Sequence, residues 1–369
     1  MHFVNGYIFK DGKFSKGELW VADSVIHPKG SKKEESIDVK GQFIIPGLID
    51  LQLNGAFGHD FTADPKGVAE VSKQLGRFGV TAFLATLVSA KPKAYRSTLP
   101  QLQRLIGRSP GAELLGIHLE GPLINPLEVK AHTFVASDAF SSPAECYGSL
   151  EGVKLVTLAP EVTGAAEWIR SLHQQGIVVS AGHSRASAAE MERAIDNGVQ
   201  MATHLFNGMG SFHHRAPGIV GAVLSRPGFC YSLIADGIHL DPHVVKMAWR
   251  AQPEGLILVS DAMAAAGTPD GEYVLGSRVV SVNNGVAKIK GEEVLAGCAY
   301  GLGELLARFC AMSGASLAEA VPCVTEKPAR LLGLYPKKGS LEIGADADLT
   351  ILDQHLKVVS CYAKGQKIF

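Results

Sequence analysis

The chain has 369 residues, 46% of them hydrophobic and 19% charged, and its formal net charge at pH 7 is −1. This apolar content excludes an intrinsically disordered protein and is ample for a large core. The near-zero charge offers no attraction to nucleic acid or to an anionic membrane, so we expect neither as a partner. Six cysteines without a CxxC pair indicate reduced thiols. No signal-like segment follows Met1 and no apolar run reaches about 18 residues, so we expect a cytoplasmic protein.

Both ends of the chain read as short strands. Strand-like runs occupy residues 3–9, 18–22 and 43–45 near the N-terminus, and 347–352 and 357–361 near the C-terminus. Neither end is long enough to bury a core alone. We therefore predict one small β-sandwich domain built from residues 1–45 plus 335–369, with residues 46–334 inserted between its halves. The alternative is two independent β extensions.

The inserted region alternates strand-like runs with plausible helices. The runs cover residues 44–53, 81–88, 114–119, 154–158, 177–181, 200–204, 231–234 and 256–260. Most are continuously apolar, which is typical of parallel strands buried on both faces. Eight such repeats predict a (β/α)8 TIM-like barrel. A doubly wound open sheet is the alternative, but no GxGxxG follows the first run.

Three polar residues stand at the ends of these runs with the spacing of a metal site. His183 and His204 follow neighbouring runs, and the C-terminal strand ends of a barrel form its active face. In LLGIHLEGP, residues 114–122, the two-residue period places His118 and Glu120 on one face. Two histidines and a glutamate with an open fourth position form a known catalytic zinc set. We expect His118 to pack inside the barrel instead.

Other run ends are polar as well. The first ends in DLQLNG, the seventh is followed by Asp236 and His239, and the eighth by Asp261. Because these ends would meet at one mouth, the pattern predicts an active site there.

Together these segments carry a resemblance that covers essentially the whole chain. The matching motifs are PGLIDLQLNG (46–55), GIHLEGP (116–122), VTLAPE (156–161), SAGHS (180–184), THLFNGM (203–209), HHRAPG (213–218), ADGIH (235–239), SDAMAAAG (260–267), LAG (295–297) and GSLEIGADADLTILD (339–353). The chain resembles the N-acetylglucosamine-6-phosphate deacetylases of the amidohydrolase superfamily. The resemblance implies a distorted barrel with a β-sandwich from both termini, a phosphorylated amino-sugar substrate, and a homo-oligomer, either dimer or tetramer.

The resemblance also implies roles for individual residues. Glu120, His183 and His204 would be the metal ligands, Asp261 the general base and acid, and His132 a substrate contact near the acetyl group. Asn207, Gly208 and Arg215 would bind the sugar phosphate side with Asp236 and His239, while Ala131, Leu295, Ala296 and Gly297 would line the substrate site.

Several positions depart from the family pattern. Gln52 and Asn54 stand where many amidohydrolases have His-x-His, so we expect one divalent metal per chain, with zinc as the expected ion. Lys130 and Gly208 replace a usual glycine and a frequent alanine. Ala216 stands where an acid usually follows the arginine, and 298–300 reads CAY where small hydroxyl residues are usual.

The expected reaction is removal of acetate from N-acetyl-D-glucosamine 6-phosphate in amino-sugar catabolism. The alternatives are the galactosamine epimer as substrate, a cyclic-amide hydrolase, and a catalytically silent binding barrel. The missing His-x-His counts against the cyclic-amide hydrolase. The retained ligand set with Asp261 counts against the silent barrel.

Overall fold

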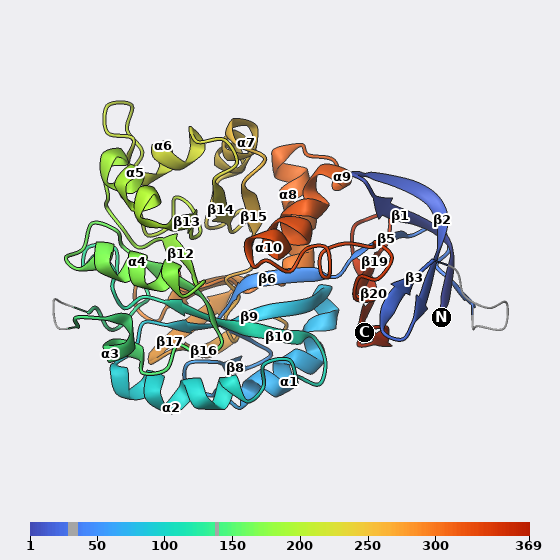
Figure 1. The fold of residues 1–369 in the computed structure, drawn as a ribbon, viewed down its shortest axis with the longest axis horizontal. Helices are drawn as coiled ribbons and strands as arrows, with labels where there is room; N and C mark the ends of the chain where they lie inside the picture. Colours follow the sequence, from blue (N-terminus) through green and yellow to red (C-terminus); the bar gives the residue numbers. More distant parts are fainter. Residues whose placement is uncertain (29–35, 137–139) are drawn as a thin grey trace.

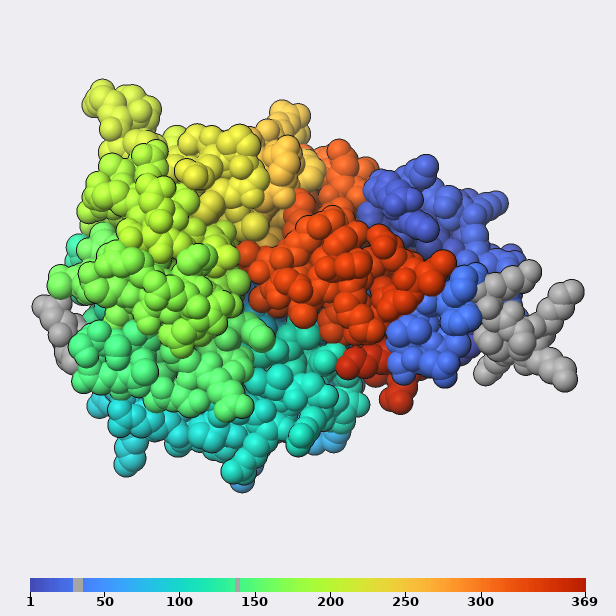
Figure 2. Space-filling view, viewed as in Figure 1, coloured from blue at the N-terminus to red at the C-terminus, as the bar shows by residue number. Residues whose placement is uncertain are grey.

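A computed structural model describes residues 1–28, 36–136 and 140–369. It has two parts: a barrel surrounded by helices, and a smaller sheet in which the first and last strands of the chain lie together (Figure 1). The space-filling view shows the blue N-terminal strands packed directly against the red C-terminal segment (Figure 2). Within the described residues, no helix is long and apolar enough to cross a membrane.

The barrel is a sheet of eight parallel strands, which confirms the predicted barrel. In spatial order they are β6 (Leu48–Leu53), β9 (Val80–Val88), β10 (Glu113–Glu120), β11 (Val153–Leu158), β12 (Val178–Ala181), β13 (Val199–Ala202), β14 (Cys230–Leu233) and β15 (Leu256–Leu258). Every residue of β6 and β9 is buried, as expected for parallel strands covered on both faces.

The first predicted run, residues 44–53, is divided in the structure. Its first half is β5 (Phe43–Pro46) in the smaller sheet, and its second half is β6 in the barrel. The chain crosses between the two sheets at Gly47. A Cβ atom there would lie 2.1 Å from Thr81 Oγ1, so only glycine permits this close crossing.

Helices follow the barrel strands and cover the outside of the barrel (Figure 1). They are α1 (Gly67–Gln74), α2 (Pro92–Gln103), α3 (Pro143–Tyr147), α4 (Ala165–Gln174), α5 (Ala188–Asn197), α6 (Gly218–Leu224), α7 (Pro242–Ala251), α8 (Leu302–Ser313), α9 (Leu317–Ala320) and α10 (Glu326–Leu331). Helix α5 begins with a capping box, in which Ser187 and Glu190 satisfy each other's backbone N–H groups. Its Met191 and Ala194 face the core.

The barrel closes through a short seam between its first and last strands. Strand β15 has three residues, and β6 and β15 stand at opposite ends of the strand order. Just beyond β15, Asp261 N donates to Gln52 O at 2.9 Å and Asn54 N donates to Ala262 O at 2.8 Å. The barrel is therefore distorted, with its closure concentrated at the C-terminal end of the strands.

The smaller sheet draws its eight strands from both termini. They are β1 (His2–Lys10), β2 (Lys13–Ala22), β3 (Val25–His27), β4 (Ser36–Asp38), β5, β19 (Leu349–Leu352), β20 (Val358–Ala363) and β21 (Gln366–Lys367). Phe3 of β1 and Tyr362 of β20 have ring centroids 5.1 Å apart, although β5 and β19 lie between these strands in the sheet. The sheet therefore curls around its own apolar core.

A buried lysine links the smaller sheet to the barrel. Lys338, 5% exposed, places Nζ 2.8 Å from Glu113 at the start of β10, 2.9 Å from Asp346 and 2.8 Å from Asp348. Burial alone raises the pKa of Glu113 and of Asp346, but the neighbouring lysines, Lys338 among them, bring both below their ordinary values. The lysine thus holds three carboxylates together at the junction.

An antiparallel sheet of three strands was not predicted. Its strands are β16 (Gly271–Leu275), β17 (Arg278–Asn283) and β18 (Val286–Ile289). The two residues between β17 and β18 are Asn284 and Gly285, both with positive φ, which is a strong hairpin signal in the sequence. Two further short strands, β7 (Gly55–Ala56) and β8 (His59–Asp60), form a hairpin after β6.

Candidate active site

A cavity of about 320 Å³ opens at the C-terminal ends of the barrel strands. Its walls combine strand ends, the loop after β10 and the segment after β18. The predicted site residues that line it are Glu120, Ala131, His132, His183, His204, Asn207, Gly208, His239, Asp261, Leu295 and Gly297. Lys130, Leu275, Glu293 and Val294 also line it, three of them contributed by or following the unpredicted sheet.

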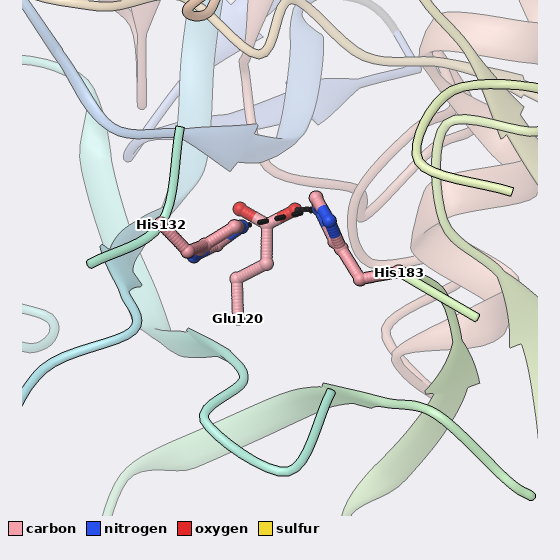
Figure 3. A group of neighbouring side chains, drawn as sticks. All are labelled: Glu120, His132 and His183. Atoms are coloured by element: carbon pink, nitrogen blue, oxygen red, sulfur yellow. Dashed lines mark hydrogen bonds and ion pairs between the residues drawn. The ribbon is translucent and has the colours of Figure 1, made fainter. Parts of the chain in front are cut away.

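The carboxylate of Glu120 is the centre of this group. Its Oε1 lies 3.2 Å from His183 Nε2 and 2.9 Å from His204 Nε2. All three side chains are buried. Figure 3 shows the rings of His132 and His183 converging beside this carboxylate, and the two Nε2 atoms lie 3.1 Å apart. The predicted convergence of three strand ends is thus present in the structure.

Hydrogen bonding assigns the proton on His183. Its Nδ1 lies 2.8 Å from the carbonyl oxygen of Glu128, which can only accept, so Nδ1 carries a hydrogen. In the neutral ring the lone pair of Nε2 then faces Glu120 Oε1. Two acceptors at 3.2 Å repel each other unless a proton or a cation lies between them. The donor set therefore fits a divalent metal ion.

His132 has the opposite tautomer. The backbone N–H of Ser89 donates to His132 Nδ1 at 3.1 Å, so the hydrogen of the neutral ring is on Nε2. That Nε2 lies 3.1 Å from His183 Nε2. Burial, reinforced by His183, lowers the pKa of His132 to about 3. His132 is therefore a neutral hydrogen-bond donor that points into the cavity.

Asp261 is held by two amides that sequence reasoning treated only as missing histidines. Asn54 Nδ2 donates to Asp261 Oδ1 at 2.7 Å, and Gln52 Nε2 donates to the same oxygen at 3.1 Å. Gln52 Nε2 also donates to Glu120 Oε1 at 3.0 Å. Burial, followed by the charge of Glu120, raises the pKa of Asp261 to about 6. The two-residue spacing of Gln52, on β6, and Asn54, just after it, was the signal that could have revealed this shared face.

Three of these side chains stand on unusual backbone. The φ angles are 47° at His183, 33° at His204 and 48° at Asp261. Left-handed conformations are uncommon for residues other than glycine and are found preferentially at functional sites. Here each one turns the chain immediately after a barrel strand and directs its side chain into the cavity.

Behind the cavity wall, a carboxylate supports His239. Asp236 Oδ2 lies 2.7 Å from His239 Nδ1, and both side chains are buried. A carboxylate that accepts from Nδ1–H leaves Nε2 as the ring atom available to the cavity. Asp236 and Ala296 do not line the cavity themselves. Asp236 lies behind His239, and the buried Ala296 stands between Leu295 and Gly297 in the chain.

Arg215 is not brought together with the other predicted residues. It is exposed in the loop 211–216, and its Nη1 lies 3.2 Å from His214 Nε2. Together with residues of 184–189 it lines a neighbouring hollow. Figure 2 shows the chain around this loop projecting from the surface at the upper left.

Comparison with known proteins places this geometry in a family. The model of the amidohydrolase family matches residues 43–368. N-acetylglucosamine-6-phosphate deacetylase from Danio rerio is 40% identical over 100% of this chain and 96% of its own length. The structure of N-acetylglucosamine-6-phosphate deacetylase from Thermotoga maritima superposes with a TM-score of 0.90 at 31% identity, covering 100% of this chain and 99% of that one. N-acetylgalactosamine-6-phosphate deacetylase from Escherichia coli O157:H7 is 32% identical over 97% of this chain and 96% of its own length.

These matches extend over both sheets and over every strand end that carries a cavity residue. The chain belongs to the amidohydrolase family and, within it, to the N-acetylglucosamine-6-phosphate deacetylases.

Proposed function

We propose that this protein hydrolyses the acetamido group of N-acetyl-D-glucosamine 6-phosphate, releasing acetate and glucosamine 6-phosphate for amino-sugar catabolism. The observation that carries the proposal is one cavity in which Asp261, a carboxylate held by two amides, faces the ligand set centred on Glu120. The 40% identity to a deacetylase of that substrate supports it.

We propose Glu120, His183 and His204 as the ligands of one zinc ion. By distance alone, the described residues offer Glu120, His132 and His183 as a metal cluster. The hydrogen on His132 Nε2 argues against His132 as a ligand, because a protonated nitrogen has no lone pair to give to a metal. His204 Nε2 lies closer to Glu120 than His183 Nε2 does. When bound, zinc lowers the pKa of a water molecule and polarises the amide carbonyl.

The protein's own groups then perform the proton chemistry. Asp261 accepts a proton from the attacking water and returns it to the amine nitrogen as the C–N bond breaks. A carboxylate whose pKa is raised towards 6 is better suited to this exchange near neutral pH than an ordinary one. His132 Nε2–H donates a hydrogen bond to the carbonyl oxygen as negative charge develops on it.

The remaining predicted residues are proposed as substrate contacts. Gly208 leaves room beside the site, because a Cβ there would lie 2.9 Å from His183 Nδ1. Leu295, Gly297 and Ala131 line the same cavity as His239 and are proposed to contact the sugar, with Asp236 fixing the His239 ring. Arg215 remains our proposed phosphate contact. The domain division at 45/46 and 334/335, the cytoplasmic location and the homo-oligomeric state stay predictions.

The test is acetate release from N-acetylglucosamine 6-phosphate, its galactosamine epimer and unphosphorylated N-acetylglucosamine, with metal analysis of the same preparation. We expect the first substrate to have the highest kcat/KM, since identity to the glucosamine relative exceeds that to the galactosamine one. Preference for the epimer would reassign the sugar. A metal-loaded protein that releases no acetate from any of the three would support the silent-barrel alternative.

A further inference from the structure

A chain of polar side chains crosses the barrel interior. We call it the belt: Thr86, His118, Thr157, Thr203 and Ser180. Thr86 Oγ1 lies 3.2 Å from His118 Nδ1, and His118 Nε2 lies 2.8 Å from Thr157 Oγ1. Thr157 Oγ1 lies 2.7 Å from Thr203 Oγ1, which lies 2.5 Å from Ser180 Oγ. None of the five is more than 1% exposed.

The belt lies one layer below the proposed metal ligands. His118 precedes Glu120 by two residues on the same face of β10. Thr157 pairs with Glu120 in the register of β10 and β11. Thr203 directly precedes His204, and Ser180 stands on β12, three residues before His183. Each proposed ligand thus lies at or just after the end of a strand that the belt connects to its neighbours.

Hydrogen counting makes the belt a single unit. A neutral imidazole has one N–H and one lone pair, and each hydroxyl has one hydrogen to donate. Both ring nitrogens of His118 are engaged by hydroxyls, so the donors must all run in one direction along the chain. Removing the hydroxyl of Thr157 would take one hydrogen-bond partner from His118 and one from Thr203, and would divide the belt in two. Because both of its nitrogens are engaged, the His118 ring is also unavailable as a metal ligand.

This layer is unusual for its position. Barrel interiors are normally filled by branched apolar side chains in stacked layers, and a buried polar network stabilises only when every member is satisfied. The apolar residues flanking the belt on the same strands, such as Leu119 and Val156, point away from it into the surrounding core. A polar layer that links the three ligand-bearing strand ends with their neighbours β9 and β11 therefore calls for a role in the site.

We propose that the belt is a positioning device for the metal site, in which His118 and Thr157 fix the spacing of β10 and β11 and Thr203 fixes the start of the His204 loop. The inference rests on the proposed metal site. Its members touch neither substrate nor metal. They act through the backbone that carries Glu120, His183 and His204.

The test compares two variants at the centre of the belt. Thr157→Val keeps the side-chain shape and removes the hydroxyl, whereas Thr157→Ser keeps the hydroxyl. Zn²⁺ affinity is measured on the full chain by competition with a chromogenic chelator. We expect Thr157→Val to bind Zn²⁺ roughly 10- to 100-fold more weakly, the usual scale for groups that support metal ligands. Thr157→Ser should remain close to the parent.

A matched control separates positioning from general stability. Thr325 is fully buried, and its hydroxyl donates to Val321 O at 2.8 Å rather than to the belt. Thr325→Val should lower the thermal midpoint of the chelator-treated protein but leave Zn²⁺ affinity unchanged. The proposal would be refuted if Thr157→Val bound Zn²⁺ with parental affinity. It would also be refuted if Thr157→Ser and Thr157→Val lost Zn²⁺ affinity equally.

If Thr157→Val does not fold, Ser180→Ala carries the test, since it removes only the terminal hydroxyl of the belt. We expect Ser180→Ala to bind Zn²⁺ measurably more weakly than the parent, and parental affinity would overturn the proposal. Failure of the parent itself to bind Zn²⁺ or to release acetate would instead count against the proposed function.

Discussion

The side-chain amide of Asn54 donates to the carboxylate of Asp261 across the barrel seam, at 2.7 Å and over 207 positions of sequence. This bond occupies the region where His-x-His would offer ligands to a second cation. An amide N–H there stabilises the ionised carboxylate without a metal and orients one of its oxygens.

Asn54→Ala should lower kcat with little change in KM. Hydrogen bonds to charged groups contribute about 1.5–3 kcal/mol, which corresponds to a roughly 10- to 100-fold loss. Because the amide favours the charged form, its removal should raise the pKa of Asp261 and move the acidic limb of the kcat profile to higher pH. Asn197→Ala, at the C-terminal end of α5, is the control. An unshifted acidic limb would contradict this account.

Asp261→Asn should leave folding and metal content intact while kcat falls about 10²- to 10⁴-fold, the usual contribution of a general acid–base group. The substitution preserves shape but removes the ability to accept a proton. Steady-state kinetics with metal analysis and circular dichroism check it. A variant that keeps more than about a tenth of the parental kcat, a loss well below that scale, would place the base elsewhere.

Metal content should reach one ion per chain in fully active protein. Gln52 Nε2 and Asn54 Nδ2 present hydrogens, not lone pairs, towards Asp261, so they repel a second cation. Plasma emission analysis after loading and desalting measures the stoichiometry. Two tightly held equivalents, both required for activity, would show that these amides rearrange.

Arg215→Ala should lower kcat/KM for the phosphorylated sugar by the equivalent of about 2–4 kcal/mol if Arg215 binds the phosphate. Phosphate binding holds the amide in place from a remote point, so the loss should appear mainly in kcat/KM. Activity on the unphosphorylated sugar should be low and nearly unchanged. Arg193→Ala, an exposed arginine of α5, is the matched control. Equal losses on both sugars would refute the phosphate role.

Lys338→Met should destabilise the protein by about 3–5 kcal/mol at neutral pH, because buried carboxylates lose their partner. Glu113 and Asp346 have depressed pKa values in the folded state. Their contribution is therefore present above the ordinary carboxylate range and is lost as pH falls through the folded values. The difference between parent and variant in denaturant unfolding should shrink with acidification. A pH-independent difference would exclude this electrostatic origin.

The parts of the fold that follow local rules were predictable. Mostly continuous apolar runs marked all eight barrel strands, because that signal lies within a few neighbouring residues. The cavity residues at strand ends followed from barrel geometry. The three-stranded sheet was missed, although Asn284-Gly285 offered a turn signal, since its short strands interrupt the expected alternation.

Other features could not be read from spacing. The bonds from Gln52 to Glu120 and to Asp261 span 68 and 209 positions and depend on which strands meet at the seam. The position of Arg215 depends on the path of the loop that carries it, and a sequence motif does not specify that path. Which ring nitrogen of a histidine carries the hydrogen can be assigned only when the hydrogen-bond partner of the other nitrogen is known. For His132 that partner is the backbone N–H of Ser89.

The seam between β6 and β15 has a consequence for local unfolding of the protein. Its backbone bonds, from Asp261 N to Gln52 O and from Asn54 N to Ala262 O, join the same residues whose side chains orient the carboxylate. A local opening there would disconnect Asp261, the proposed general base, while most of the barrel stays folded. The amide hydrogens of Asn54 and Asp261 should then exchange with solvent before those of β9 and β10. Their exchange rate would measure how often the proposed base is transiently out of place.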